Sequence, residues 1–317
     1  MPTTPTDPFS INQRLGRGVN IIGYDPIWKS RSAGRIQVKH FKLIRAAGFN
    51  HVRINLHPFL FMDKAPEFTI QPAWLETLDW ALEQCRSNGL LAIADLHEFT
   101  ALATDPFGLK PKFLAAWRQL AERYQDASED VLFEILNEPN GRLTPEIWND
   151  YLKEPLALIR ASNPTRTVII GPAFWNGIDY LHRLTLPAYN RHIIVTVHYY
   201  HPMAFTHQGA AWSPENKGRT GVTWMGTETE KQAIQRDFAG VQDWALEHQL
   251  PILLGEFGAY DKGDMESRVR YTSFVAREAE RLGWSWSYWQ FDSDFIAFDI
   301  DHDSWVEPIR NALLPAG

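Results

Sequence analysis

Short apolar runs and amphipathic stretches alternate along the whole chain. The apolar runs, rich in Val, Ile and Leu, are typical of strands buried on both faces, as parallel strands flanked by helices are. Between them, apolar residues recur with the period of an α-helix. The apolar runs predict strands over residues 17–22, 51–56, 90–96, 131–136, 168–171, 193–197, 252–255 and 285–289. The amphipathic stretches predict helices over residues 38–47, 73–87, 112–124, 146–161, 178–184, 231–247, 268–282 and 304–313.

Glycines support the predicted ends of three helices. Gly48, Gly89 and Gly283 each follow a helical pattern and stand shortly before a predicted strand. A helix commonly ends at a residue in the left-handed conformation, which glycine adopts without steric cost.

The repeated order of strand and helix predicts the fold class. Repeated right-handed crossovers either close a parallel sheet or wind it doubly, and no Pro/Gly/Ser linker divides the chain. The doubly wound alternative usually has a glycine-rich phosphate loop after an early strand, which is missing here. We therefore predict an α/β protein, with residues 1–317 forming a single (β/α)8 barrel domain and residues 1–10 a flexible N-terminal segment.

Composition narrows the classes of partner. The formal net charge is -7 and no basic block occurs, which argues against nucleic acid or a membrane surface and fits a neutral substrate. The only cysteine is Cys85, so no intramolecular disulfide can form. No apolar run approaches the length of a membrane span, and the first residues lack the pattern of a secretion signal. The 13 Trp residues exceed ordinary core needs, so some are expected to stack on ligands.

Two glutamates stand where an apolar run gives way to a turn, Glu138 in FEILNEPNG and Glu256 in ILLGEFG. Pro139 cannot donate to a neighbouring strand, so the strand should stop with Glu138 at its carboxyl end. In a barrel all carboxyl ends open at one mouth, where the chemistry is done. Two carboxylates facing one another there are what cleavage of a glycosidic bond requires.

Other polar and aromatic residues follow the same strand ends. A metal site is the competing use of this set, but no HExxH or comparable spacing supports it. The residues are Arg53, Asn55, His57, His97, Glu98, Asn137, His198, Tyr200 and Trp289.

On these residues the chain resembles glycoside hydrolase family 5, the large cellulase and mannanase family. The resemblance covers nearly the whole chain, from RGVN at residue 17 to SYWQF at residue 287. The matching motifs are Arg53 in HVRINL, His97 in IADLH, Asn137 and Glu138 in LNEP, His198 and Tyr200 in VHYY, Glu256 in GEFG and Trp289 in SYWQ.

The resemblance implies a role for each matched residue. Glu256 is expected to be the nucleophile, kept ionised by Arg53 and Tyr200, and Glu138 the acid and then the base. The two carboxyl groups are expected about 5 Å apart, with retention of configuration. The remaining roles are a hydrogen bond to the sugar 2-hydroxyl by Asn137, ordering of the substrate and the acid by His97 and His198, and a floor under the sugar by Trp289.

Residues outside the matched set have weaker indications. Trp28, Trp175, Trp212 and Trp224 are candidates for stacking on further sugars, with packing of their own loops as the alternative. Asn20 is a candidate for a sugar hydroxyl, with turn stabilisation as the alternative. The loop over residues 200–231 is long and is expected to form one wall of the cleft. Asp292, Asp294 and Asp299 could bind hydroxyls or a cation, or simply face solvent.

Three more residues are expected to have structural roles. Counting back by two from Glu138 puts Leu136, Glu134 and Leu132 on the same side. Glu134 should therefore point into the barrel, where a basic residue from a neighbouring strand should pair with it. His51 and His192 stand at strand beginnings and should lie at the opposite end.

The function expected from the resemblance is a retaining endo-β-1,4-glucanase that acts on cellulose-like or mixed-linkage glucans. It needs no cofactor and no metal, acts as a monomer, and is extracellular or periplasmic because its substrate is a polymer. The alternatives are a β-mannanase or other β-glycanase, a carbohydrate-binding protein without activity, and a metal-dependent hydrolase.

Overall fold

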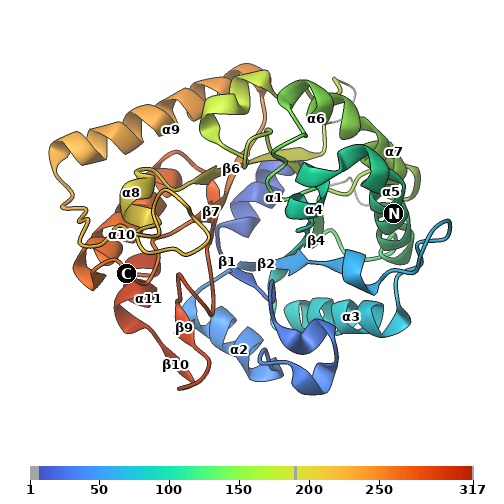
Figure 1. Ribbon diagram of the computed structural model, residues 1–317, viewed down its shortest axis with the longest axis horizontal. Helices are drawn as coiled ribbons and strands as arrows, with labels where there is room; N and C mark the ends of the chain where they lie inside the picture. Colours follow the sequence, from blue (N-terminus) through green and yellow to red (C-terminus); the bar gives the residue numbers. More distant parts are fainter. Residues whose placement is uncertain (1–6, 189–190, 316–317) are drawn as a thin grey trace.

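The computed structural model describes residues 7–188 and 191–315. In this part of the chain, eight parallel strands close into a barrel in chain order, with helices around it (Figure 1). The barrel prediction is confirmed, and the doubly wound alternative is wrong. The strands are β1 (Arg17–Ile21), β2 (His51–Leu56), β3 (Leu91–Leu96), β4 (Val131–Glu134), β5 (Val168–Ile170), β6 (Ile193–Tyr199), β7 (Ile252–Phe257) and β8 (Ser285–Tyr288).

Most predicted helices are present, with shifted ends. The stretch 146–161 forms two helices, and 178–184 forms a 3-10 helix, η4. The last helix begins three residues later than predicted, because residues 304–305 form strand β10. These elements are α2 (Val38–Ala47), α3 (Pro72–Ser87), α5 (Pro106–Arg123), α6 (Pro145–Tyr151), α7 (Lys153–Ser162), η4 (Ile178–Arg183), α9 (Glu228–His248), α10 (Met265–Arg281) and α11 (Glu307–Leu313).

The loops carry further short elements that the pattern did not predict. Most have fewer than two turns, too short for a periodic signal. They are α1 (Pro8–Leu15), η1 (Pro26–Trp28), η2 (Arg31–Ala33), η3 (Pro58–Phe61), α4 (Phe99–Thr104), α8 (Met203–Thr206), β9 (Phe298–Asp299) and β10 (Ser304–Trp305).

The three glycines expected after helices have the predicted conformation. Gly48, Gly89 and Gly283 have φ angles of 112°, 67° and 76°, all in the left-handed region. Each ends its helix and turns the chain toward the next strand.

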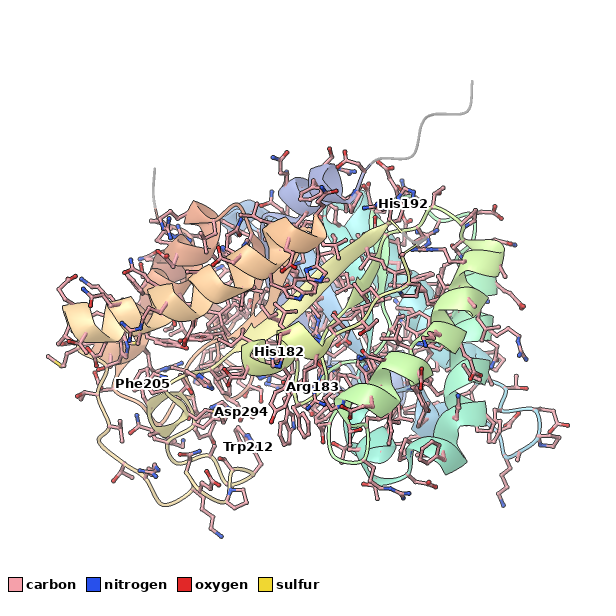
Figure 2. The ribbon with its side chains drawn as sticks, turned by 90° about the horizontal axis from the view of Figure 1, so that it is seen from above. His182, Arg183, His192, Phe205, Trp212 and Asp294 are labelled. Atoms are coloured by element: carbon pink, nitrogen blue, oxygen red, sulfur yellow. The ribbon has the colours of Figure 1, made fainter. Side chains whose placement is uncertain are left out.

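Helix α1 closes the lower end of the barrel, which is the end where the strands begin. Its Ile11 and Leu15 pack in one cluster with inward side chains of the strands, such as Ile93 and Leu132. Of the segment 1–10 that was predicted to be flexible, residues 8–10 form the first turn of α1, and residues 1–6 lie outside the described part. His192 lies at this end, opposite Trp212 and Asp294 (Figure 2), as its place before β6 suggested.

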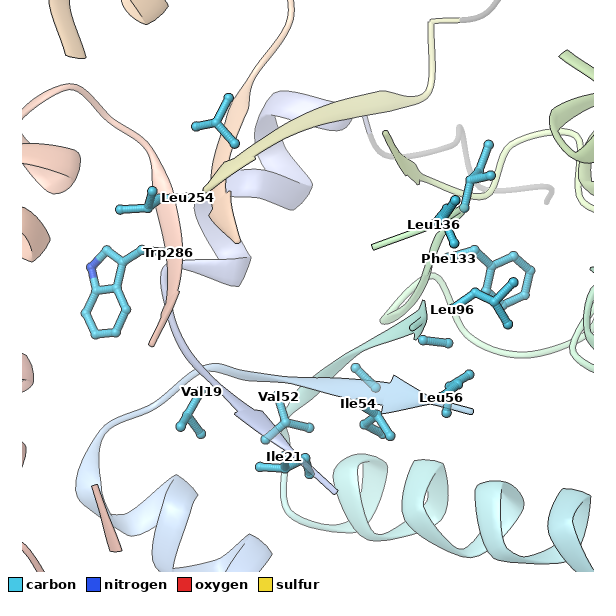
Figure 3. Close-up of a cluster of buried hydrophobic side chains, with 14 of the residues drawn as sticks. Val19, Ile21, Val52, Ile54, Leu56, Leu96, Phe133, Leu136, Leu254 and Trp286 are labelled. Atoms are coloured by element: carbon cyan, nitrogen blue, oxygen red, sulfur yellow. The ribbon is translucent and has the colours of Figure 1, made fainter. Parts of the chain in front are cut away.

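The main hydrophobic core surrounds the barrel. Figure 3 shows side chains on the outer side of the strands, among them Val52, Phe133 and Trp286, which pack toward the helices. Leu136 belongs to this outer cluster as well. The prediction that Leu136 shares a side with Glu134 is wrong, because β4 ends at Glu134 and the strand alternation stops there.

Glu134 points into the barrel and is paired, as predicted. The Arg53 guanidinium donates to it through Nε (2.7 Å to Oε2) and Nη2 (2.8 Å to Oε1). Arg53 lies on β2, two strands around the barrel from β4. The two side chains can meet because alternate strands contribute side chains to the same layer.

The helices lie against the barrel as globular packing requires. Within the described residues, none is long and apolar enough to cross a membrane.

A tryptophan on α5 provides a test of this packing. Trp117 is fully buried, contacts Phe133 and donates from Nε1 to the Ile135 carbonyl (2.9 Å). We expect Trp117→Ala to lower the free energy of unfolding by about 3–5 kcal/mol, because it opens a cavity and leaves a carbonyl unpaired. Chemical denaturation would measure this. The control is Trp212→Ala, since Trp212 is 52% exposed and its loss should change stability little; equal losses would contradict the packing.

Candidate active site

The turn after β4 presents Glu138 at the mouth of the barrel. The Asn137 N–H donates to the Leu96 carbonyl of β3 (2.9 Å), which extends the strand pairing beyond β4. Glu138 then adopts a φ of 43°, and Asn140 Nδ2 donates to its carbonyl (2.7 Å). A glutamate in the left-handed region is unusual, and such residues cluster at functional sites.

Glu256 on β7 lies beside Glu138. His198 on β6 lies between them, with Nδ1 at 2.8 Å from Glu138 Oε1 and 3.6 Å from Glu256 Oε2. A carboxylate oxygen of each glutamate and a ring nitrogen of His198 all lie within 4.8 Å of one another. The two glutamates that the sequence singled out thus form a close pair.

Arg53 and Tyr200 bind Glu256 from below and from the side. Arg53 Nη1 donates to Glu256 Oε1 (2.8 Å), and the Tyr200 hydroxyl donates to Oε2 (3.0 Å). Arg53 Nη2 also donates to Asn137 Oδ1 (2.8 Å). Both oxygens of Glu256 therefore accept hydrogen bonds that favour its ionised form.

The two glutamates have different electrostatic surroundings. Burial, and then the negative charge of Glu256, raises the pKa of Glu138 well above its usual value. Burial raises the pKa of Glu256, and the charge of Arg53 with the hydrogen bonds from Arg53 and Tyr200 limits the rise to about 7. The proton of the pair therefore resides on Glu138, and the charge on Glu256.

His97 is held on the other side of the mouth. Its Nδ1 lies 2.6 Å from Asp95 Oδ2, and its Nε2 lies 3.2 Å from Asn137 Nδ2. Since the Asp95 carboxylate accepts a hydrogen bond from Nδ1–H of His97, Nε2 carries a lone pair and accepts from the Asn137 amide. Trp289 stacks on the His97 ring, with centroids 5.6 Å apart and planes inclined by 8°.

A cavity of about 970 Å³ lies over these residues. Glu138, Glu256, His97, His198, Tyr200 and Trp289 line it. Its walls include Trp175 and Trp212, which are 53% and 52% exposed. The loop after β6 contributes His201, Met203, His207 and residues 212–215, so the prediction that it forms a wall is confirmed.

Three residues expected at the sugar lie elsewhere. Asn20 is fully buried, where it donates to the Gly255 and Tyr288 carbonyls and accepts from Arg53. Trp28 stacks on Trp74 (centroids 4.8 Å apart) beneath the surface. Trp224 is 2% exposed and packs on α10. Trp28 and Trp224 pack their own surroundings, which was the alternative interpretation for both. Asn20 instead links β1 to β7, to β8 and to Arg53, which differs from both of its interpretations.

Of the remaining acidic candidates, one reaches the cavity and the others contact neighbouring residues. Asp294 lines the cavity, whereas Asp292 pairs with Arg35 (3.1 Å) and Asp299 with His302 (2.7 Å). Glu98 turns away and accepts from the Phe59 N–H (2.6 Å).

Sequence reasoning missed several residues of the site. Asp95 could have been found by counting back two residues from His97 along β3. Tyr24 lines the cavity after β1 and stacks on His57, with centroids 5.4 Å apart. Asn176, behind His198, had no signal in the sequence, because a turn places it there.

The same donors could bind a metal ion, and the Glu138, His198 and Glu256 set is the only such group among the described residues. Arg53 and Tyr200 already occupy both oxygens of Glu256. A guanidinium at 2.8 Å would repel a cation at that carboxylate, so the donor set fits a metal poorly.

Comparisons with known proteins agree with this geometry. Residues 13–294 match the family model described as Cellulase (glycosyl hydrolase family 5). The chain is 32% identical to Endoglucanase H of Acetivibrio thermocellus over 98% of its own length, and it spans 34% of that relative. It spans 52% of Endoglucanase 3 of Fibrobacter succinogenes, at 25% identity over 94% of its own length.

Solved structures match over the full barrel. Endoglucanase Cel5A from the hyperthermophilic Thermotoga maritima superposes with a TM-score of 0.92 at 39% identity, covering 97% of this chain and 100% of that one. The same enzyme has been solved in complex with cellobiose and in complex with mannotriose. The closed barrel, the paired glutamates and the matching family model together show that this chain belongs to glycosyl hydrolase family 5, the cellulase family.

Proposed function

We propose that the protein is a retaining endo-β-1,4-glucanase that cleaves internal bonds of cellulose-like or mixed-linkage glucans. The observation that carries the proposal is the pair Glu138 and Glu256, whose nearest oxygens lie within 4.8 Å of one another below an open cavity. Retaining glycosidases place their carboxyl groups about 5–5.5 Å apart, and inverting ones about 6.5–9.5 Å, to admit a water molecule.

The first half of the reaction forms a covalent intermediate. An oxygen of Glu256 attacks the anomeric carbon and forms a glycosyl ester, while the bond to the leaving oxygen breaks. Glu138 transfers its proton to that oxygen, so the leaving chain departs as an alcohol. Arg53 and Tyr200 keep Glu256 ionised until it attacks.

The second half returns both glutamates to their starting state. Once Glu256 is esterified its negative charge is gone, so the pKa of Glu138 falls and Glu138 can act as a base. Water gives a proton to Glu138 and attacks the anomeric carbon, which releases the sugar and Glu256. Two displacements on the same carbon retain its configuration.

The surrounding residues support this assignment. His97 and Arg53 hold Asn137 at both ends of its amide, which suits a hydrogen bond to the sugar 2-hydroxyl. Trp289 lines the cavity beside His97 and suits the floor under the cleaved sugar. Trp175 and Trp212 are exposed in the walls, and flat indole faces suit the apolar faces of further sugars.

The substrate class follows from the cleft and the relatives. Among the described residues, the cavity wall contains no Lys or Arg, which fits an uncharged polysaccharide. A β-mannan is the second candidate, because the similar Cel5A of Thermotoga maritima has been solved with mannotriose as well as with cellobiose. We propose no cofactor, action as a monomer, and an extracellular or periplasmic location, because a polymer cannot enter the cell.

Substitution of either glutamate should abolish most of the activity. We expect Glu256→Gln and Glu138→Gln each to lower kcat on glucan by at least about 100-fold. The first removes the nucleophile that attacks the anomeric carbon, and the second removes the proton donor for the leaving oxygen. Both amides keep the shape of the side chain, so the thermal unfolding curves should stay close to that of the wild type. Reducing-sugar release measures the rates, and wild-type rates in either variant would refute the assignment.

The stereochemistry of the wild-type product is the companion measurement. Proton NMR during early hydrolysis of a cello-oligosaccharide should show the β-anomer first, with the α-anomer appearing later by mutarotation. An α-anomer formed first would exclude the double displacement.

The acid limb of the pH profile should depend on Tyr200. Its hydroxyl stabilises ionised Glu256, so Tyr200→Phe should raise the pKa of Glu256 and move the acid limb of kcat/KM upward by about one pH unit. The control is Tyr199→Phe, whose hydroxyl donates instead to Asp237 on α9 (2.7 Å). An acid limb that stays in place in Tyr200→Phe would contradict the role of this hydrogen bond.

A substrate panel tests the choice of polysaccharide. We expect activity on carboxymethylcellulose and mixed-linkage glucan, with release of several oligosaccharides and a rapid fall in viscosity that marks internal cleavage. The panel includes xyloglucan and mannan, and each assay is repeated with EDTA, which should leave the rates unchanged. Activity on mannan alone would favour the second candidate, and loss of activity with EDTA would favour a metal-dependent hydrolase.

A further inference from the structure

The turn after β5 has an unusual backbone. Phe174, Trp175 and Asn176 have φ angles of 57°, 59° and 52°, so three consecutive residues other than glycine adopt the left-handed region. Asparagine tolerates this region, but Phe and Trp rarely do, and such outliers persist where the surrounding structure imposes them. The turn exposes Trp175 to the cavity and buries Asn176 completely.

Asn176 contacts the histidine that lies between the two glutamates. The backbone carbonyl of Asn176 accepts from the backbone N–H of His198 (2.9 Å), and the side-chain Nδ2 of Asn176 lies 3.3 Å from Nε2 of the His198 ring. Gly171 makes room for it, because a Cβ there would lie 2.2 Å from Asn176 Oδ1. Asn176 is therefore locked against the far side of the His198 ring.

The surroundings of His198 determine where its ring proton lies. Burial lowers the pKa of His198 well below its usual value, so the ring is neutral and carries one proton. Nδ1 faces Glu138 Oε1 at 2.8 Å and Glu256 Oε2 at 3.6 Å. The two carboxyl oxygens around Nδ1 attract an N–H group and repel a nitrogen lone pair. Nδ1 therefore carries the ring proton and is the donor. Nε2 is then an acceptor, and the Asn176 amide supplies its hydrogen bond.

We propose that Asn176 is a positioning residue that holds His198 in the Nδ1–H tautomer and thereby decides which oxygen of Glu138 carries the catalytic proton. This inference rests on the proposed role of Glu138 as the acid. With Nδ1 as donor, Oε1 of Glu138 is an acceptor, so the acidic proton must reside on Oε2.

The reverse tautomer would be unproductive. Its Nδ1 would be a lone pair, which would accept the proton of Glu138 through Oε1 and turn it away from the leaving group. Among the described residues, Oε2 of Glu138 has no hydrogen-bond partner, and Glu138 lines the cavity. In the Nδ1–H tautomer, the proton on Oε2 is therefore free for the substrate.

Substrates with different leaving groups distinguish this role from a structural one. Phenyl β-cellobioside needs protonation of its leaving oxygen, whereas 2,4-dinitrophenyl β-cellobioside does not. In Asn176→Asp an acceptor replaces the donor and draws the ring proton to Nε2. We expect kcat/KM to fall roughly 10- to 100-fold for the phenyl glycoside and less than about threefold for the dinitrophenyl glycoside.

A second variant protects the test against misfolding. Asn176→Gly keeps the positive φ without steric cost and removes the amide donor. If circular dichroism shows that Asn176→Asp is not folded, the glycine variant should show the same preference for the good leaving group. Equal losses on both substrates, or no loss on either, would overturn the inference.

Two further variants interpret the result. Asn163→Asp is the matched control, since Asn163 is also buried and also donates from Nδ2 (2.8 Å to the Ala121 carbonyl), but at the lower end of the barrel before β5. It should leave the ratio of the two rates unchanged. Glu138→Gln must favour the dinitrophenyl glycoside strongly. If it does not, the proposed function fails; if it does and the Asn176 variants do not, only the present inference fails.

Nitrogen NMR of the imidazole observes the tautomer directly. In the ¹⁵N-labelled wild type, the His198 signals should be those of a protonated Nδ1 and an unprotonated Nε2, and in Asn176→Asp the two should exchange character. Assignment comes from loss of the signals in His198→Gln. A protonated Nε2 in the neutral wild-type ring would overturn the inference.

Discussion

The guanidinium of Arg53 is fully buried in the barrel, and the polar interior is arranged around it. It forms ion pairs with Asp95 (3.1 Å), Glu134 (2.7 Å) and Glu256 (2.8 Å), from β3, β4 and β7. A buried charge without partners is costly, so each of these acids must be in place when the barrel closes. The barrel satisfies this requirement because its strands bring residues distant in sequence together in its interior.

The same charge separates the properties of the two catalytic candidates. Arg53 contacts Glu256 directly and stabilises its ionised form. Glu138 has no such cation as a hydrogen-bond partner in the described chain; it faces the charge of Glu256 instead, and its carboxyl is bound by neutral His198. One fixed cation, placed closer to one carboxylate than to the other, thus gives two identical side chains the different proton affinities that our proposal assigns to an acid and a nucleophile.

The histidines at the mouth show a second common principle. His97 and His198 are both neutral, and in each a partner at one ring nitrogen determines what the other nitrogen can do. Asp95 accepts from Nδ1 of His97, so Nε2 of His97 accepts from Asn137. In our proposal Asn176 donates to Nε2 of His198, so Nδ1 of His198 donates to Glu138. The loops outside the barrel, by contrast, supply exposed aromatic surfaces such as Trp175 and Trp212.

The sequence by itself determined the barrel, its eight strands and the two glutamates. Apolar runs with helical stretches between them leave few ways to bury both faces of a sheet, and a carboxylate ending such a run must have a partner. The sequence also pointed to Glu134 as an inward residue, although the count from Glu138 passed through Leu136, where the alternation fails. Only the tertiary structure decided which tryptophans reach the cleft, that Asn20 binds Arg53, and that Asn176 lies behind His198. Those contacts depend on turns with no periodic pattern, where the direction of a side chain follows from the backbone and from what packs beside it.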